Sequence, residues 1–284
     1  MLYIGSHTSI AGGLENAAIE ADSLGASAFG MFTKNQRQWA TRPITEEQST
    51  RFKEMLASLG FTKEQVLPHG SYLINLGNPD GLKRRQSLDA FIDELSRVGQ
   101  LGLDKLNFHP GAHVNMLDRT GSLKLVSEAL DEALQETEGV MPIIETTAGQ
   151  GSTLGSSFEE IEMLLNLSRY PERLGVCIDT CHIFAAGYDI RGEEAFAKTF
   201  ELFDRVVGFA NLRGMHLNDA KIKLGSRLDR HESLGKGEIG LDPFIRIVQD
   251  ERFMNIPLIL ETIDSTLWKE EIALLKASSQ KTMQ

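Results

Sequence analysis

Six short apolar runs of this chain each end in a histidine or a carboxylate. The runs read as strands, and their last residues are His69, His109, Glu145, Asp179, His216 and Glu261. Strands that are covered on both faces, as in parallel sheets, have such continuous Val, Ile and Leu sequences. Burying one unpartnered imidazole or carboxylate is costly, so six such endings are hard to explain by chance. The pattern therefore predicts a shared site at one edge of a parallel sheet.

Three further candidate ligands follow two of these runs: His182, Asp229 and His231. We expect Asp179 and His182 to lie across a strand-to-loop turn, where they could serve neighbouring ions. Asp229 and His231 are two residues apart, so in an extended segment they project to the same side. Five histidines and four carboxylates are too many for one tetrahedral ion, and they are ligand types that zinc prefers. With three ligands each and one bridging carboxylate, three Zn2+ ions account for the set.

Eight strand-like runs can be placed along the chain, with starts 25 to 45 residues apart. They lie near residues 2–6, 27–33, 64–69, 105–109, 141–145, 174–179, 212–217 and 257–261. Each interval has room for a strand, a helix and two loops, and several intervals show helical periodicity. Eight such units with polar groups at the strand ends predict an α/β fold, a (β/α)8 TIM-type barrel whose site lies at the C-terminal ends of the strands. An open doubly wound sheet is the alternative, but it would gather ligands around one switch point only.

The chain reads as one catalytic barrel domain over residues 1–277, followed by a polar tail over residues 278–284. It has 284 residues, 41% of them hydrophobic, without a linker-like or low-complexity stretch. It lacks an 18-residue apolar run and a signal-peptide pattern, so we expect a soluble cytoplasmic protein without a membrane partner, monomeric by default. Cys177 and Cys181 lack zinc-knuckle spacing and are expected to be small buried residues.

The formal net charge of −11 argues, taken alone, against a nucleic-acid partner. Three divalent ions would add six positive charges in one place, however, and the four carboxylate ligands cancel only four of them. The positive pocket that results could accept a phosphate. Metal ions about 3.5–4 Å apart activate water and stabilise the attacking and leaving oxygens of an in-line displacement. The ligand set therefore suits phosphoryl transfer.

Three stretches of the sequence resemble the signatures of the endonuclease IV family of zinc-dependent apurinic/apyrimidinic (AP) endonucleases. They are His69–Gly77, Gly175–His182 and Met215–Lys221 continued by Gly225–His231. The resemblance extends from Ile4 to Thr262, nearly the whole chain. It implies a (β/α)8 barrel with three zinc ions, a substrate of double-stranded DNA that contains abasic sites, and a role in base-excision repair. The implied reaction hydrolyses the phosphodiester 5′ to the abasic site and leaves a 3′-hydroxyl and a 5′-deoxyribose phosphate.

The resemblance also implies a role for each ligand. His69, His109 and Glu145 would hold one zinc, and Glu145 would bridge to a second. The second zinc would be bound also by Asp179, His216 and Glu261, and the third by His182, Asp229 and His231. Glu145, with Glu261, would help to orient the attacking water.

Two loops gain a meaning from the same resemblance. The matching loops of the family enter the DNA, and here they carry Asn35, Gln36, Arg37, Tyr72 and Leu73. Apolar or aromatic wedges kink a duplex, and extruding a nucleotide is least unfavourable where its base is absent. Core packing is the usual role of a Tyr-Leu pair, so the loop assignment depends on the resemblance.

Four further residues bear on the candidate site. Thr146 stands where the family pattern leads us to expect Asn, and Gly70 where we expect an acidic or small polar residue. His7 closes the first expected strand at the same edge and could support a ligand. His113 is expected to be a hydrogen-bonded loop residue, a support for a ligand or a phosphate contact.

Two other functions fit parts of the pattern. A metal-dependent sugar isomerase or epimerase on the same barrel also uses Glu, Asp and His at strand ends, but needs only one or two ions. It would not require the set of His182, Asp229 and His231. A damage-binding protein with structural zinc would be expected to close each site with four protein ligands, commonly including Cys.

Overall fold

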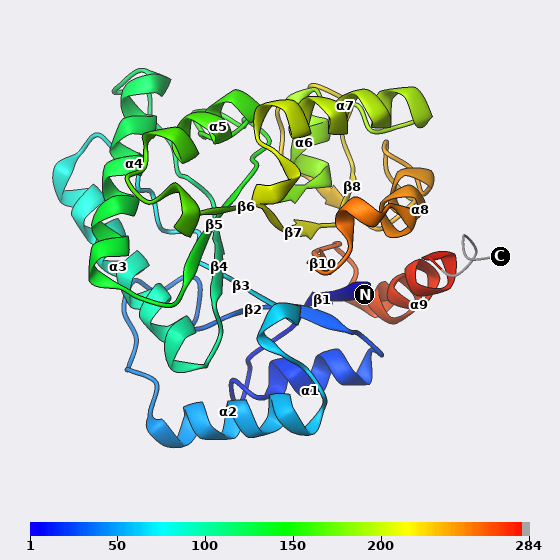
Figure 1. Cartoon of the computed structure of the whole chain (residues 1–284), viewed down its shortest axis with the longest axis horizontal. Helices are drawn as coiled ribbons and strands as arrows, with labels where there is room; N and C mark the ends of the chain where they lie inside the picture. The colour runs from blue at the N-terminus through cyan, green and yellow to red at the C-terminus, as the bar shows by residue number, and fades with distance from the viewer. Residues whose placement is uncertain (280–284) are drawn as a thin grey trace.

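Eight parallel strands close into a barrel in the computed structural model, which describes residues 1–279 (Figure 1). Their order around the barrel is β1-β10-β7-β6-β5-β4-β3-β2. The strands are β1 (Tyr3–His7), β2 (Ala28–Phe32), β3 (Val66–His69), β4 (Lys105–Phe108), β5 (Met141–Glu145), β6 (Gly175–Asp179), β7 (Leu212–His216) and β10 (Pro257–Leu260). Each coincides with an expected run to within two residues at either end. The predicted (β/α)8 barrel is therefore confirmed.

Helices surround the barrel on its outer side (Figure 1). They are α1 (Asn16–Ser23), α2 (Glu46–Ser58), α3 (Gly81–Gln100), α4 (Arg119–Glu136), α5 (Phe158–Leu167), α6 (Thr180–Ala186), α7 (Glu193–Val206), α8 (Asp242–Gln249) and α9 (Trp268–Ser279). Among the described helices, none combines the length and apolar character that a membrane crossing requires. Helix α9 continues through Ser279, and Ser278 is buried. The expected tail was therefore wrong for residues 278–279, while its remainder, 280–284, lies outside the described residues.

Side chains fill the interior of the barrel below its C-terminal edge. A separate buried cluster is formed there by Ala28, Leu67, Ile143, Cys177 and Ile259. A Cβ atom added to Gly214 on β7 would lie 2.7 Å from Cδ2 of Leu67, which comes from β3 on the opposite side of the barrel. Leu67 thus spans the interior, and any side chain at position 214 would displace it. This apolar layer is a floor beneath the polar strand ends, as expected of a packed barrel.

A small antiparallel sheet stands outside the barrel after β7. It pairs β8 (Asp219–Ala220) with β9 (His231–Glu232). The Asp219 carboxylate is buried and accepts hydrogen bonds from the backbone N–H groups of Ala220, Gly237 and Ile239. This pairing folds the intervening loop back, so that residues 229–231 return to the mouth of the barrel.

Candidate metal centre

The six strand-end ligands lie together at the C-terminal edge of the barrel, as predicted. Four of them are the last residues of their strands: His69, Glu145, Asp179 and His216. The other two, His109 and Glu261, directly follow β4 and β10. Parallel strands end at one edge, so the barrel itself brings together residues that are far apart in the sequence.

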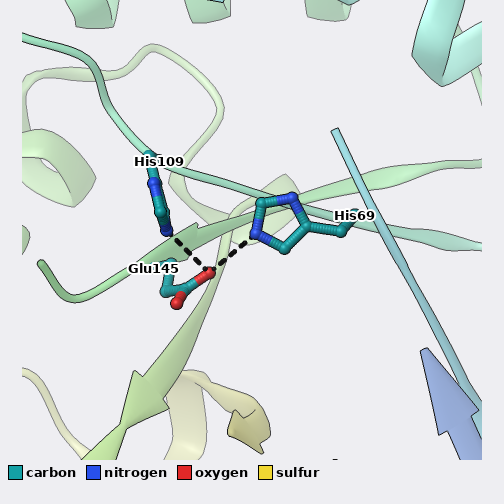
Figure 2. A group of neighbouring side chains, drawn as sticks. All are labelled: His69, His109 and Glu145. Atoms are coloured by element: carbon teal, nitrogen blue, oxygen red, sulfur yellow. Dashed lines mark hydrogen bonds and ion pairs between the residues drawn. The ribbon is translucent and has the colours of Figure 1, made fainter. Parts of the chain in front are cut away.

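The first group of possible ligands is His69, His109 and Glu145, shown in Figure 2. Both imidazoles direct Nε2 toward the same carboxylate oxygen, Oε2 of Glu145, at 3.1 Å from His69 and 3.3 Å from His109. Glu145 and His69 are buried, whereas the His109 side chain is 30% exposed. One ion could therefore be held at the rim, with a face open toward solvent.

A second group lies on the other side of the Glu145 carboxylate. It consists of Asp179, His216 and Glu261, with ligand atoms within 4.8 Å of one another. Nδ1 of His216 is 3.2 Å from Oε2 of Glu261 and 3.1 Å from Oε1 of Glu145. One oxygen of Glu145 thus faces the first group and the other faces the second. This is the position that a bridging carboxylate requires.

His182, Asp229 and His231 form the third group. The two Asp229 oxygens lie 3.2 Å from Nε2 of His182 and 3.2 Å from Nε2 of His231. The expected strand-to-loop turn before His182 was wrong, because α6 begins directly after β6. Asp179 is the N-cap of this helix, and its Oδ1 accepts the His182 backbone N–H at 2.8 Å. The short helix turns His182 from the second group toward the third.

Three of the histidines are oriented by backbone carbonyls. Nδ1 of His69 lies 2.7 Å from the Gly70 oxygen, Nδ1 of His182 2.8 Å from that of Thr146, and Nδ1 of His231 3.1 Å from that of Glu261. A carbonyl only accepts, so each Nδ1 carries the proton and each Nε2 is available to the cluster. Histidines that bind metals are typically held in this way. The residues therefore fit divalent metal ions.

The charges of the cluster lead to the same conclusion. Burial lowers the pKa of His216, but Glu261, Glu145 and Asp179 outweigh burial and raise that pKa to about 10. Burial likewise opposes ionisation of Glu145, but the surrounding histidines hold its pKa well below the ordinary value. Without a metal, the carboxylates thus retain protons on the imidazoles. A cation can take the place of those protons, since it is attracted by the same oxygens.

Cys181 also lies near ligand atoms, with Asp179 and His231. Burial, together with the charge of Asp179, raises the pKa of the Cys181 thiol to about 12. The thiolate, which is the form that binds metals, is therefore disfavoured at neutral pH. Cys177 and Cys181 are both buried and free, as the sequence predicted.

Two loops border the cluster with the predicted DNA-contacting residues. Arg37 is exposed in the β2–α2 loop and Tyr72 is 56% exposed in the β3–α3 loop, while Leu73 beside it is half-buried. The Tyr72 ring lies 5.2 Å from the His69 ring and 5.9 Å from the His109 ring, measured between centroids. A groove of about 660 Å³ next to the cluster is lined by polar and apolar residues, among them His7, Asn35, Gln36, Arg37 and Trp268.

Comparison with known proteins places the chain in a family. A family model described as a xylose isomerase-like TIM barrel matches residues 19–278. The probable endonuclease 4 of Campylobacter concisus (strain 13826) is 52% identical over 276 residues, which cover 97% of this chain and 98% of that protein. The crystal structure of endonuclease IV from Thermus thermophilus is similar with a TM-score of 0.87 and 32% identity, over 99% of this chain and 100% of that one. This chain belongs to the endonuclease IV family.

The barrel of this endonuclease IV family member is also shared by more distant proteins. A D-tagatose 3-epimerase-like protein has a TM-score of 0.76, covers all of both chains and is 15% identical. An identity this low shows a common fold and carries no argument about the reaction.

Histidines 7 and 113 differ in their relation to the cluster. Nδ1 of His7 lies 2.8 Å from Oε1 of Glu261, so His7 contacts a candidate ligand. Within residues 1–279, His113 belongs to none of the possible ligand groups. Its backbone N–H donates to the Ser152 carbonyl, and its buried Nδ1 has no described hydrogen-bond partner.

Two positions departed from the expected endonuclease IV pattern, and both contact ligands. Oγ1 of Thr146 accepts the backbone N–H of Asp179 at 3.0 Å, while the Thr146 carbonyl orients His182. Gly70 contributes only its carbonyl, toward His69.

Sequence reasoning missed two buried asparagines. Asn107 on β4 donates to Oε2 of Glu145, and Asn218 after β7 donates to Oδ2 of Asp179 at 2.7 Å. Both are fully buried. The sequence contained a signal for both, because each is a polar residue at a strand end, two residues from a candidate ligand.

Proposed function

We propose that this chain is a DNA-repair endonuclease that hydrolyses the phosphodiester 5′ to an abasic site with the help of three zinc ions. The observation that carries the proposal is the convergence of nine His, Asp and Glu side chains into three neighbouring groups, with Glu145 between the first group and the second. Membership in the endonuclease IV family supports it. The third group, His182, Asp229 and His231, favours this reaction over a sugar isomerase, which needs at most two ions.

The proposed ligands divide among the three ions as the groups divide. His69, His109 and Glu145 would hold the first, and His182, Asp229 and His231 would hold the third. Asp179, His216 and Glu261 would hold the second, and Glu145, which also faces this group, would contribute to it. Zinc ions, when bound there, supply an activated water and neutralise charge on the phosphate.

Glu145 and Glu261 are the proposed catalytic residues. Their pKa values are lowered by the surrounding histidines against the opposing effect of burial, so both stay ionised and can orient a water by accepting its hydrogen atoms. His7 fixes the Glu261 carboxylate through the 2.8 Å contact. Attack of this water on the phosphorus forms one P–O bond and breaks the bond to the 3′ oxygen of the preceding nucleotide. The proton that the water gives up balances the one that the 3′ oxygen takes up. The products are a 3′-hydroxyl and a 5′-deoxyribose phosphate.

The β2–α2 and β3–α3 loops would recognise the damaged site by how easily the DNA deforms there. Arg37, with Asn35 and Gln36, and Tyr72, with Leu73, would occupy the space that a missing base leaves. Tyr72 stays neutral because its partial burial, with the carboxylates nearby, raises the pKa of its hydroxyl. A neutral ring can be inserted between base steps without repelling phosphates. Abasic sites would be preferred because they resist distortion least.

The test is incision of a labelled duplex that carries one abasic-site analogue, beside an undamaged duplex of the same sequence. Each is incubated with metal-loaded protein and with protein treated with a zinc chelator. We expect a single cut 5′ to the analogue by the metal-loaded protein only. Binding without cutting would indicate a damage-binding protein. The absence of both binding and cutting would favour the alternative of a metal-dependent sugar isomerase or epimerase.

A further inference from the structure

A buried carboxylate on α3 links the two loops that border the metal centre. The Glu94 side chain is 1% exposed and lies outside the ligand cluster. Its Oε2 accepts the hydroxyl of Thr33 at 2.8 Å, at the start of the β2–α2 loop. Its Oε1 accepts the backbone N–H of Ser71 at 3.3 Å, at the start of the β3–α3 loop. One side chain therefore anchors both loops within their first two residues.

A second set of contacts joins the same loops. The Ser71 hydroxyl donates directly to the Gln36 carbonyl at 2.7 Å. Nζ of Lys34 lies 3.5 Å from Oε1 of Glu94 and 3.4 Å from the carbonyl of Trp39, which ends the Asn35–Trp39 segment. Arg37 and Tyr72 are thus presented from segments that are fixed to each other.

Positive and negative side chains alternate around Glu94 in equal number. Lys34, whose side chain is 2% exposed, also contacts Asp93 at 2.8 Å, and Asp93 in turn accepts from Nε of Arg97 at 2.9 Å. Two cations therefore face two carboxylates on one side of α3. Lys34 and Glu94 are both buried, whereas the Asp93 side chain is 43% exposed. A buried ion pair adds little net stability compared with apolar packing. The arrangement is suited to positioning more than to stabilisation.

We infer that Glu94 is a positioning residue for DNA recognition, which holds the Arg37 and Tyr72 loops in register for one damaged site. The inference rests on the proposed function. Glu94 touches neither the ligands nor, by its burial, the DNA, so it acts through Thr33, Lys34 and Ser71. Its loss should weaken duplex binding and leave the metal chemistry intact.

The test is the substitution Glu94→Gln in metal-loaded protein. The amide nitrogen that replaces one oxygen can neither accept a hydroxyl nor attract Lys34. We expect KM for the abasic duplex to rise about tenfold, equivalent to roughly 1.4 kcal/mol. We expect kcat, the metal content and the hydrolysis of bis(p-nitrophenyl) phosphate, which needs no loops, to be unchanged. Hydrogen exchange should become faster at the amides of residues 35–39 and 71–73.

Two further variants make the result interpretable. Asp89→Asn removes an exposed carboxylate of the same helix, paired with Arg85, and should leave KM unchanged. Ser71→Ala removes the bond from the hydroxyl to the Gln36 carbonyl and the 3.3 Å bond that the hydroxyl accepts from the Leu73 backbone N–H, and it leaves the contact of the Ser71 backbone with Glu94 in place. It should raise KM in the same direction. This variant carries the test if melting shows that Glu94→Gln is unfolded.

An unchanged KM in a folded Glu94→Gln protein, or in Ser71→Ala if Glu94→Gln does not fold, overturns the inference alone. An equal fall in kcat and in bis(p-nitrophenyl) phosphate hydrolysis does the same, because it would assign Glu94 to the metal centre. A wild-type protein that does not incise the abasic duplex overturns the proposed function together with the inference.

Discussion

Asn218 donates a 2.7 Å hydrogen bond from Nδ2 to Oδ2 of Asp179. With its Oδ1, the same side chain accepts the backbone N–H of Glu261 at 2.9 Å. Asn218 is fully buried, and through these two bonds it connects two proposed ligands of one ion at the ends of β6 and β10. Hydrogen-bond partners of this kind orient ligands and strengthen metal binding, although they do not touch the ion.

Replacing Asn218 by Ala should weaken the second metal site. We expect incision activity to fall about 10- to 100-fold at limiting zinc, the range typical of such partners. Added zinc should restore part of the loss. Activity is measured against free zinc in a metal buffer, with Asn166→Ala, an exposed position on α5, as the matched control. An unchanged zinc dependence would contradict the role assigned to Asn218.

Replacing His109 by Ala should remove one ion, whereas His113→Ala in the same loop should not. Nε2 of His109 faces Glu145 at 3.3 Å, and His113 belongs to no ligand group within the described chain. We expect at least about a hundredfold loss of activity for His109→Ala, since a direct ligand should matter more than the partner of one. Metal analysis of both purified variants checks the ion count. Equal metal contents in the His109→Ala and His113→Ala proteins would show that His109 is not a metal ligand.

The strand ends could be predicted from the sequence because the same pattern of residues recurs at each of them. A polar residue that ends an apolar run recurs at His69, Glu145, Asp179 and His216, and parallel strands bring such ends to one edge. The shared edge therefore followed from the strands alone. The division of the ligands among three ions came from the family resemblance, and it stays a prediction until metals are measured.

Other features of the site could not be predicted from the spacing of residues along the sequence. The helix that begins at Thr180 is only seven residues long, too short for its periodicity to be detected, so His182 was expected after a turn. Asn218 and Glu94 act through partners that are 39 and 61 residues away in the chain, Asp179 and Thr33. Only the tertiary structure brings such pairs together. The sequence around a single polar residue does not indicate which distant residue it contacts.

Metal-free protein should become less stable as the pH rises from 6.5 to 9. Burial lowers the pKa of His216 and His231, but the carboxylates outweigh it and raise these values to about 10 and about 9, above the ordinary 6.5. Their bound protons therefore stabilise the fold fully below pH 6.5, and this contribution is lost as the pH approaches the raised values. We expect the Tm of chelator-treated protein to fall by several degrees, since 1 kcal/mol corresponds to about 2–4 °C in a domain of this size.

Metal-loaded protein is the control for this experiment. Its imidazoles bind ions in place of protons, so its Tm should not decline over the same range, and removal of the metals should lower it at every pH. Differential scanning calorimetry of both forms in the same buffers makes the comparison. A metal-free Tm that rose with pH would show that the buried histidines are neutral and that the cluster is organised differently.

The Tyr72 ring, and not its hydroxyl, should matter for the abasic duplex. Tyr72 is 56% exposed beside His69 and His109, where an aromatic ring can stack in the space of a missing base. Stacking of a base on an aromatic side chain contributes roughly 1–3 kcal/mol, so Tyr72→Ala should weaken binding about tenfold or more. Tyr72→Phe keeps the ring and should bind like the wild type. Affinities are measured by fluorescence anisotropy at fixed salt, after metal analysis has shown that both variants retain their ions. Equal losses in the two variants would mean that the hydroxyl makes the contact, and the wedge assigned to Tyr72 would have to be abandoned.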